Sequence, residues 1–322
     1  MPIPNSTFTE ILSTTLNKYQ RSFTDNVTNR NALLDRIRKN GNMRVVNDGG
    51  ATIQRQLSYA ENSTFQYYSG YETLNVSPSD TLTSANYEWK QAAVNITISG
   101  REKAVNGGAS KMIDLVTART KTAIATMANN ISVGLYSDGT GSGGKQIGGL
   151  QLIVADDPTS GTVGGIDAST QTWWRNVVYS AATDGGTAAT SANIISYMNA
   201  TYDSVYLNGD APDLIIADSN YFGLYRNALQ NIQRITTAGV GTSGFRALEF
   251  MGDIPVVLDN NVPSNHMYFL NTKDLYFDMM AGRDFAVGEM KESVNQDAFV
   301  MPILFMGNLT CANRRNQALL KA

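Results

Sequence analysis

Cysteine and histidine are almost absent from this chain, and their scarcity excludes much catalytic chemistry. Its 322 residues include one cysteine, Cys311, and one histidine, His266. A lone cysteine cannot form an internal disulfide, and a lone histidine excludes a two-histidine metal site within one chain. A Ser-His-Asp triad would have to use His266, but its position between a proline-containing turn and an expected strand favours a structural role. We therefore expect no enzymatic activity, no cofactor and no bound metal.

Charged residues and long hydrophobic runs are also scarce. Hydrophobic residues make up 42% of the chain and charged residues 16%, as in a globular protein with a polar, lightly charged surface. No stretch approaches the roughly 18 apolar residues of a membrane span. The start, MPIPNSTFTEIL, lacks the charged beginning and apolar run of a signal peptide. We expect no membrane partner.

The small net charge of −3 conceals an uneven distribution. Residues 1–44 hold seven basic and three acidic residues, a net charge of +4, which leaves −7 for the remainder. A basic segment on an acidic body is typical of a surface that binds a polyanion or an acidic partner. A solvent-exposed helix face explains the charge equally well. No basic groove interleaved with aromatic residues is present, which argues against sequence-specific nucleic-acid recognition.

One glycine-rich segment has the spacing of a phosphate-binding loop. Residues 139–146, GTGSGGKQ, fit the pattern G-x-x-x-x-G-K. That loop works where it follows a strand and opens a helix, with a hydroxyl residue next to bind magnesium. Here the segment follows an expected helix, precedes a strand-like stretch, and has Gln146 in place of the hydroxyl residue. We therefore reject nucleotide binding.

The N-terminal residues predict two short helices. Apolar residues within 6–22 recur at helical spacing, and a second helix is expected over 31–39, ending at Asn40-Gly41. Neither helix holds enough apolar residues to build a core, so residues 1–49 are interpreted as an arm.

Residues 52–99 change to strands and turns. Val94, Ile96 and Ile98 alternate with polar residues, and the Tyr- and Thr-rich residues 63–76 favour a second strand. The turn signal at 77–80 separates them. A 14-residue strand spans about 46 Å, longer than a compact domain needs. An isolated two-stranded ribbon is marginal in water, so we expect it to rest on another surface, although an ordinary antiparallel sheet remains an alternative.

A long amphipathic helix over residues 110–136 is the clearest element. Its length corresponds to a rod of about 40 Å. Glycines precede it at 107–108 and follow it at 139–144. One stripe carries the apolar side chains, with Thr120 at a skipped position: Ile113, Val116, Ile124, Met127, Ile131 and Leu135.

The rest of the chain mixes helices and strands without a regular βαβ repeat, which predicts an α+β fold. Helices are expected at 192–207 and 219–234. Strands are expected at 150–155, 213–218, 254–258, 267–270 and 275–279, with a strand pair or extension at 299–310.

This order of elements resembles the major capsid proteins of tailed bacteriophages with the Hong Kong 97-type fold. The segments that carry the resemblance extend in order over nearly the whole chain, although their motifs are diffuse: ITISGREKAVNGG, TARTKTAIATMANNISVGLYSDGTG, GGLQLIV, ALEFMGDIPVVLDNNVP and DLYFDMMAGRDF. The resemblance implies an N-terminal arm (1–49), an extended β-hairpin loop (50–100), a peripheral domain (101–147 and 286–322, with the spine helix at 110–136) and an axial domain (148–285).

The resemblance also implies a function and partners. The chain would assemble in the bacterial host cytoplasm into an icosahedral shell of hexamers and pentamers around phage genomic DNA. We expect non-specific contact with that double-stranded DNA, a separate scaffolding protein, a portal and a possible cementing protein. Alternatives are an encapsulin-type nanocompartment shell, a tail or decoration protein, and an uncharacterised α+β enzyme.

Two groups of residues are candidates for these contacts. Aromatic side chains bury large areas at interfaces, which makes the aromatics around the hairpin candidates for intersubunit contact: Tyr59, Tyr67, Tyr68, Tyr71, Tyr87 and Trp89. A ligand-binding stack is the weaker interpretation. The resemblance places the basic arm on the inner face of the shell, with these candidates: Arg30, Arg36, Arg38, Lys39 and Arg44.

Overall fold

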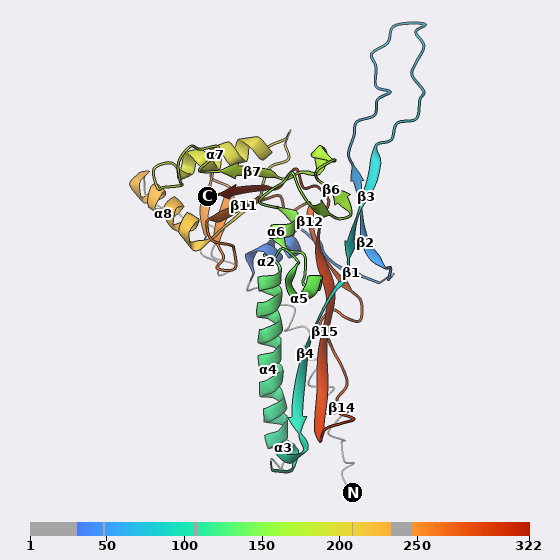
Figure 1. Ribbon diagram of the computed structural model, residues 1–322, viewed down its shortest axis with the longest axis vertical. Coiled ribbons are helices and arrows are strands. Elements are labelled where there is room, and N and C mark those ends of the chain that lie inside the picture. The colour runs from blue at the N-terminus through green and yellow to red at the C-terminus, as the bar shows by residue number, and fades with distance from the viewer. Residues whose placement is uncertain (1–30, 48, 106–108, 208, 233–246) are drawn as a thin grey trace.

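Three parts follow one long axis of the molecule. The computed structural model describes residues 31–47, 49–105, 109–207, 209–232 and 247–322. Figure 1 shows a rod, a layered domain beside one end of the rod, and a two-stranded hairpin that extends beyond the layered domain. The rod and the tip of the hairpin therefore lie at opposite ends of the molecule.

The rod combines one long helix with two long strands. Helix α4 (Ala109–Gly134) lies beside β4 (Lys90–Ser99), which pairs antiparallel with β15 (Ala298–Cys311) along its whole length. Helix α3 (Gly100–Val105) turns the chain from β4 toward α4. Four shorter strands complete this six-stranded sheet: β1 (Met43–Val46), β12 (Leu275–Met280), β13 (Ala286–Val287) and β14 (Lys291–Glu292).

The periodicity of the sequence explains how the rod packs. The alternating residues Ile96 and Ile98 of β4 are buried, and they share one core with the apolar stripe of α4. The stripe agrees with the expected helix, because its described members lie in the interior: Val116, Thr120, Ile124, Met127, Ile131 and Leu135. Thr120 satisfies its hydroxyl by donating to the Val116 carbonyl oxygen at 2.8 Å.

The layered domain has a second six-stranded sheet with two helices on one face. Its strand order is β7-β16-β11-β8-β10-β9. The strands are β7 (Val177–Ser180), β8 (Leu214–Ala217), β9 (Ala247–Phe250), β10 (Ile254–Leu258), β11 (His266–Leu270) and β16 (Ala318–Lys321). Helices α7 (Ile194–Val205) and α8 (Ser219–Ile232) cover the face that carries Ile215 and Phe269. The opposite face, with Ile216 and Tyr268, belongs to the same core as the rod. This sheet thus connects the core of the layered domain to the core of the rod.

Short elements connect the rod, the layered domain and the hairpin. They are α5 (Gly141–Gly144), α6 (Leu150–Ile153), β5 (Thr162–Val163), β6 (Ile166–Asp167) and the 3-10 helix η1 (Thr172–Trp174). The strand expected at 150–155 is wrong, because this segment forms the helical turn α6. The glycines before it allow a close approach: a Cβ at Gly149 would lie 2.4 Å from the Leu135 carbonyl oxygen. The amide of Leu150 donates to that same oxygen at 2.7 Å, so this segment caps the end of α4.

Residues 31–46 are part of the body, which corrects their assignment to an arm. The expected second helix is confirmed as α2 (Ala32–Lys39), and the Asn31 side chain caps it by accepting from the Leu33 amide at 3.0 Å. Leu33, Leu34 and Ile37 are completely buried in the main core. Three apolar residues are too few to build a core of their own, but they can complete the core of the body. The helix expected at 6–22 lies outside the described residues.

The remaining helices and strands largely agree with the expected ones. The helices at 192–207 and 219–234 correspond to α7 and α8, and the strands at 213–218, 254–258, 267–270 and 275–279 to β8, β10, β11 and β12. Residues 299–310 lie within a single strand, β15. No strand forms over 63–76: the hairpin strands are β2 (Thr52–Ser58) and β3 (Leu82–Glu88), and residues 59–81 between them have no regular strand.

Strand pairing also changes the expected domain boundaries. β4 belongs to the rod and not to the hairpin loop, because it pairs with β15 from Ser99 to Lys90. β12, expected in the axial domain, pairs with β15 in the rod sheet. β16, expected in the peripheral domain, lies between β7 and β11 in the layered domain.

Candidate assembly surfaces

The hairpin stem, β2 and β3, has a small core of its own against the body. Ile53 and Leu57 of β2 pack with Ala85 and Tyr87 of β3, and Trp174 of η1 joins them. The β5–β6 turn closes over β3, where the Gly164 carbonyl oxygen accepts from the Asn86 amide at 2.7 Å. Because Gly164 has φ +62 and a Cβ there would lie 2.8 Å from that of Ala85, glycine is required. The stem is therefore fixed in direction.

A buried polar network also holds the stem on the rod sheet. The Arg55 guanidinium pairs with the Asp278 carboxylate and donates to the Thr310 hydroxyl at 3.0 Å. The Thr310 hydroxyl in turn donates to Asp278 at 2.8 Å. The carboxylate side chain is only 1% exposed and the Arg55 side chain 12%. The guanidinium also lies 4.1 Å above the Tyr276 ring, so β2 is held by charge, hydrogen bonds and stacking.

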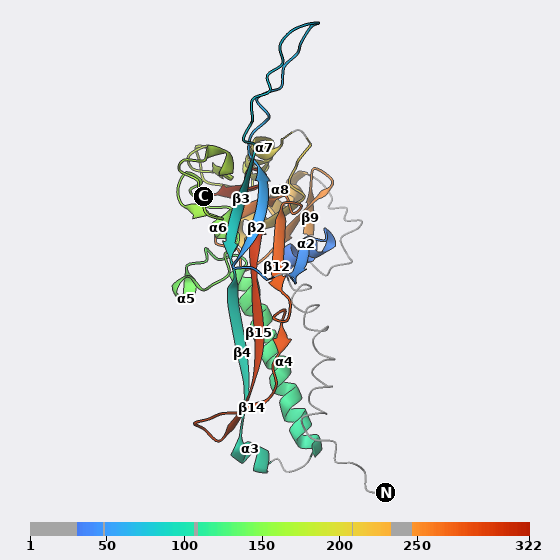
Figure 2. The same ribbon diagram turned by 90° about the vertical axis from the view of Figure 1, so that its right-hand side faces the viewer.

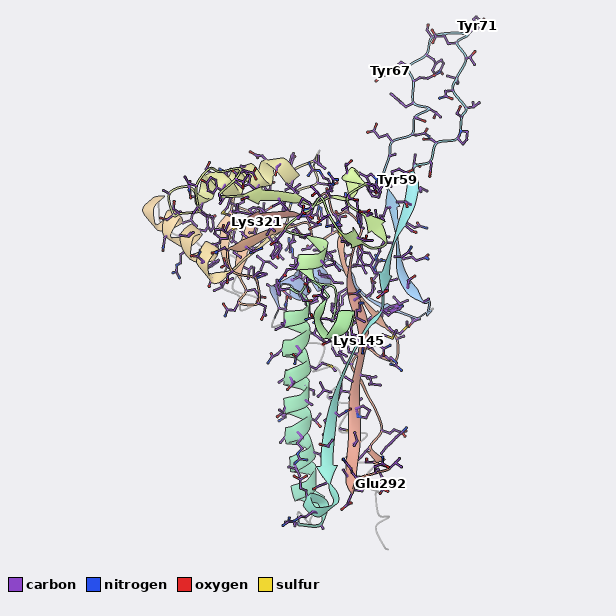
Figure 3. All side chains as sticks on the ribbon, viewed as in Figure 1. Tyr59, Tyr67, Tyr71, Lys145, Glu292 and Lys321 are labelled. Atoms are coloured by element: carbon purple, nitrogen blue, oxygen red, sulfur yellow. The ribbon has the colours of Figure 1, made fainter. Side chains whose placement is uncertain are left out.

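Beyond the stem, residues 59–81 form a distal loop that contacts little of the subunit. Tyr67 is 92% exposed and Tyr68 64%, while Tyr71 is fully exposed. Figure 3 shows Tyr67 and Tyr71 at the far tip, away from Glu292 at the opposite end. Other large apolar residues of this loop are also solvent-accessible: Phe65, Leu74 and Val76. Apolar groups exposed in a row over an extended segment are typical of a surface that binds another protein.

The other three aromatic candidates lie at the stem (Tyr87 and Trp89) or where the loop leaves it (Tyr59). Tyr87 is 4% exposed, and its hydroxyl donates to the Cys311 carbonyl oxygen at 3.0 Å, so the proposed intersubunit role of Tyr87 is wrong. Trp89 packs against the stem core and donates to the Gly50 carbonyl oxygen at 3.1 Å. Tyr59 stacks on Trp173 with ring centroids 5.3 Å apart. Strand alternation predicts an inward direction for Tyr87, since it lies two residues from Ala85.

The basic candidates are mostly engaged within the subunit. Arg36 pairs with Asp213 at 3.3 Å and Lys39 with Asp35 at 2.8 Å. The Arg44 guanidinium lies 4.6 Å from the centre of the Tyr276 ring. Arg38 is exposed at the end of α2, and Arg30 lies outside the described residues. The four described candidates therefore come from one short stretch, on α2 and β1.

The residues with catalytic potential are held in structural contacts. His266 directs Nδ1 to the Ser264 carbonyl oxygen at 2.8 Å and Nε2 to Asp156 at 3.1 Å, so the neighbouring serine offers its backbone and not its hydroxyl. Cys311 is completely buried, and burial raises the pKa of its thiol. Within the described ranges, no group of three or more His, Cys, Asp or Glu residues could hold a metal ion. None of the described helices is long and apolar enough to cross a membrane.

The glycine-rich segment does not form a phosphate-binding loop. It follows the C-terminal end of helix α4, whereas a phosphate-binding loop follows a strand, and only the short turns α5 and α6 come within it and directly after it. Lys145 is exposed on this segment, which Figure 3 shows beside the rod. The chain thus offers contact surfaces: the distal loop, the rod and the basic stretch.

Solved capsid structures share this fold over most of the chain. The cyanophage A-1(L) capsid subunit superposes with a TM-score of 0.64 at 17% identity, covering 88% of this chain and 91% of that one. The capsid of Myoviridae phage XM1 has a TM-score of 0.54 at 12% identity, covering 88% and 90%. The SrpI encapsulin of Synechococcus elongatus has a TM-score of 0.54 at 10% identity, covering 87% and 84%. No curated protein sequence matches the chain at a significant level.

These likenesses confirm the expected α+β fold, with the Hong Kong 97-like architecture that capsid subunits share. The family follows from the sequence itself, because the model of the SU10 major capsid protein family matches residues 91–299, more than half of the chain. The chain belongs to the SU10 major capsid protein family and has a structural role as a shell-forming protein of the virion.

Proposed function

We propose that this capsid protein forms an icosahedral shell of hexamers and pentamers around double-stranded phage DNA, assembling in the host cytoplasm. The observation that supports this most directly is the distal loop, whose apolar side chains extend beyond the rest of the subunit. Such a loop needs a surface that its own subunit does not provide. In a closed shell that surface belongs to an adjacent copy, for which Tyr67, Tyr68 and Tyr71 are the proposed contacts.

Further assignments accompany this proposal. The rod would form the peripheral part of the subunit, and the layered domain would be the axial part that meets others at the ring centres. The basic stretch at Arg38 and Arg44 would face inward and contact DNA without sequence preference, through charge alone. A separate scaffolding protein, a portal and a cementing protein complete the proposed set of partners, and no catalytic activity is proposed.

The test is to express the chain with and without its scaffolding protein and to examine it by negative-stain electron microscopy. Closed particles of one size class are expected. A monodisperse monomer under both conditions would overturn the proposal. The encapsulin-type alternative shares the fold, as the SrpI likeness shows, and the cargo separates the two. Nuclease-protected DNA in particles from infected cells supports the phage shell, whereas a packaged enzyme supports the nanocompartment.

Replacing Tyr71 by Ala tests the contact role of the distal loop. The ring is fully exposed in the subunit, so the melting temperature of the unassembled protein should not change. Particle yield should fall by about tenfold, since a buried aromatic contact at an interface contributes roughly 1–2 kcal/mol or more. Tyr206→Ala, at an exposed aromatic on the layered domain, is the matched control. An equal loss of folding and assembly would argue against the loop assignment.

A further inference from the structure

A pocket lies where the hairpin stem meets the body. Its volume is about 320 Å³, toward the lower end of the range of roughly 300–1,000 Å³ that is typical of small-ligand sites. Four segments line it: residues 56–59 of the hairpin, the tryptophan pair of η1, Asp274 just before β12, and residues within the turn 312–315 between β15 and β16. Figure 3 shows Tyr59 at this junction, where the distal loop leaves the stem. The pocket therefore has room for a small ligand.

Aromatic rings form one wall of the pocket. Trp173 stacks on Tyr59 with ring centroids 5.3 Å apart, and its ring centroid lies 5.6 Å from that of Trp174. Both indole N–H groups already have acceptors within the subunit. That of Trp173 donates to the Gln171 side chain at 2.7 Å, and that of Trp174 to the Val163 carbonyl oxygen at 2.9 Å. The rings therefore offer a ligand their carbon surface and π electrons, which attract apolar groups and cations.

Asp274 contributes a carboxylate with unused hydrogen-bonding capacity to the pocket. Among the described residues, this carboxylate accepts one hydrogen bond, from the Asn316 side-chain amide to Oδ2 at 2.7 Å, and no basic group forms an ion pair with it. A carboxylate can accept about four hydrogen bonds. The other oxygen, Oδ1, is therefore available to a donor in the pocket.

The charges around Asp274 favour a positive ligand. Burial is the main cause that raises the pKa of its carboxyl group. Among the nearby charges, two acids, Asp210 and Asp213, raise it further, and one base, Lys273, lowers it. Arg315 is the one basic residue among the described lining residues, and its guanidinium donates to a carbonyl oxygen of α7 at 3.1 Å. A cation beside Asp274 would therefore compensate a carboxylate that the subunit leaves unpaired.

The geometry at the carboxylate favours an ammonium group over a guanidinium group. A guanidinium is a planar fork that pairs best with both oxygens of a carboxylate. The Asn316 amide already binds Oδ2, so one oxygen of Asp274 remains for a ligand. An ammonium is a compact charge that can donate to a single oxygen. An alkyl chain attached to it would lie on the Trp173 and Tyr59 rings.

We propose that this pocket binds an alkylammonium ligand, with its charged group on Asp274 and its alkyl chain against the aromatic wall. A free amine and the lysine side chain of another protein both carry this group. The site lies within one subunit, so the inference goes beyond the shell function and does not depend on it. Because the hairpin and the body both line the pocket, a bound ligand would hold the start of the distal loop against the body.

Calorimetry and thermal unfolding of the unassembled subunit test this inference, with butylammonium as the probe. So small a ligand should bind with a Kd of about 1 mM or below. Saturation should raise the melting temperature, because the ligand binds the folded state. Two molecules of similar size are the controls: 1-butanol, which lacks the charge, and butyrate, which Arg315 would prefer. Equal binding of 1-butanol, stronger binding of butyrate, or no binding of butylammonium at about 10 mM would overturn the inference.

Substitutions in the pocket separate the two parts of the recognition. Asp274→Asn keeps the shape of the side chain but removes the charge, so it should weaken butylammonium binding by about tenfold or more. Trp173→Leu keeps an apolar wall without the ring and should weaken binding by about threefold or more. Asp203→Asn, at an exposed acid outside the pocket, should bind like the wild type. Melting temperatures without ligand show whether each variant is folded. Wild-type affinity in a folded Asp274→Asn protein would overturn the inference.

Cryo-electron microscopy maps of assembled particles, without and with saturating butylammonium, identify the source of the ligand. Without the probe, density that continues into a lysine side chain of another chain identifies a protein ligand, and separate density identifies a free amine. With the probe added, a pocket that holds neither would overturn the inference. Failure of the protein to form particles would overturn the shell function alone, because the binding measurements use the unassembled subunit.

Discussion

At the scale of single residues, buried polar side chains determine how distant segments meet. Arg314 is completely buried, and its guanidinium donates to the carbonyl oxygens of Ile153 at 2.6 Å and Trp174 at 3.2 Å, and to the side-chain oxygen of Asn176 at 3.0 Å. Burial lowers the pKa of this guanidinium. These acceptors belong to α6, to η1 and to the residue just before β7. One side chain near the C-terminus therefore joins three connecting segments.

Arg55 has the corresponding role for the hairpin stem, and its removal should destabilise the subunit. We expect Arg55→Ala to lower the free energy of unfolding by about 3 kcal/mol, because Asp278 would remain buried without its charged partner. The measurement is urea unfolding of the unassembled subunit. Lys39→Ala, which breaks the exposed pair with Asp35, should cost about 1 kcal/mol or less. Equal effects of the two substitutions would contradict a structural role for the Arg55 pair.

Asp274 should make the stability of the subunit depend on pH. Burial, followed by the nearby Asp210 carboxylate, raises the pKa of Asp274 above its ordinary value, despite the hydrogen bond from Asn316. A folded-state pKa above the unfolded one means that the fold disfavours the charged form. Asp274 therefore reduces stability above its folded pKa, and this cost disappears as the pH falls below the ordinary aspartate value of about 3.9.

The substitution Asp274→Asn removes that charge. We expect a higher melting temperature at pH 7 and a gain that shrinks toward pH 4, measured on unassembled subunits. Asn keeps an oxygen that can accept from the Asn316 amide, which donates to Asp274 at 2.7 Å. The exposed substitution Asp203→Asn is the control and should show no such gain. A gain of constant size between pH 4 and pH 7 would show that the charge of Asp274 is not its cause.

At the scale of elements, α4 depends on its apolar stripe. Ile124→Asp places an unpaired charge against the rod core, where Ile124 is 9% exposed. Because burying a lone charge costs several kcal/mol, we expect this variant to be unfolded or insoluble. Lys121→Asp, on the exposed side of the same helix, should remain folded. Circular dichroism shows whether each of the two proteins is folded. A folded Ile124→Asp subunit would contradict the packing of α4 on β4.

The elements that the sequence predicts correctly are those with a strong local period. The stripe from Val116 to Leu135 requires a helix that is buried along one side, and the alternation at Val94, Ile96 and Ile98 requires a half-buried strand. Residues 150–155 show the limit of such patterns, because a short apolar run does not distinguish a strand from a helical turn. The Tyr- and Thr-rich residues 63–76 have strand-like composition, but without a pairing partner in the subunit they form no strand.

Contacts between segments that lie far apart in the sequence cannot be predicted from local periodicity. Tyr67 and Tyr87 are the same residue type in the same hairpin, but Tyr67 is exposed and Tyr87 is buried. Their burial differs only because the body lies under the stem and not under the loop. The pairing of β16 with β7 likewise joins residues far apart in the sequence. For the candidate surfaces, the sequence therefore predicted the exposed aromatic residues of the loop but not the burial of Tyr87 under the stem.

At the scale of the whole molecule, the loop and the rod extend from opposite ends, which gives assembly a direction. In the proposed shell the loop binds a different surface of the next copy, so any open chain of subunits leaves one loop and one receiving surface without a partner at its ends. Closure into a ring gives the loop of every subunit a surface to bind. Loss of the loop from one subunit should therefore interrupt a ring, although that subunit can still receive the loop of another copy.

A loop deletion tests this directional assembly. Residues 60–80 are replaced by Asn-Gly, a two-residue turn that suits the antiparallel pair at Tyr59 and Thr81, where the Tyr59 amide donates to the Thr81 carbonyl oxygen at 3.1 Å. The stem core and the Tyr59–Trp173 stack are retained, so the melting temperature should change little. The deleted protein alone should form no particles. Mixed with wild-type subunits, it should lower particle yield more steeply than its fraction in the mixture, because one such subunit breaks a whole ring. Inhibition in proportion to the fraction of deleted protein, measured by gradient sedimentation, would contradict head-to-tail closure through the loop.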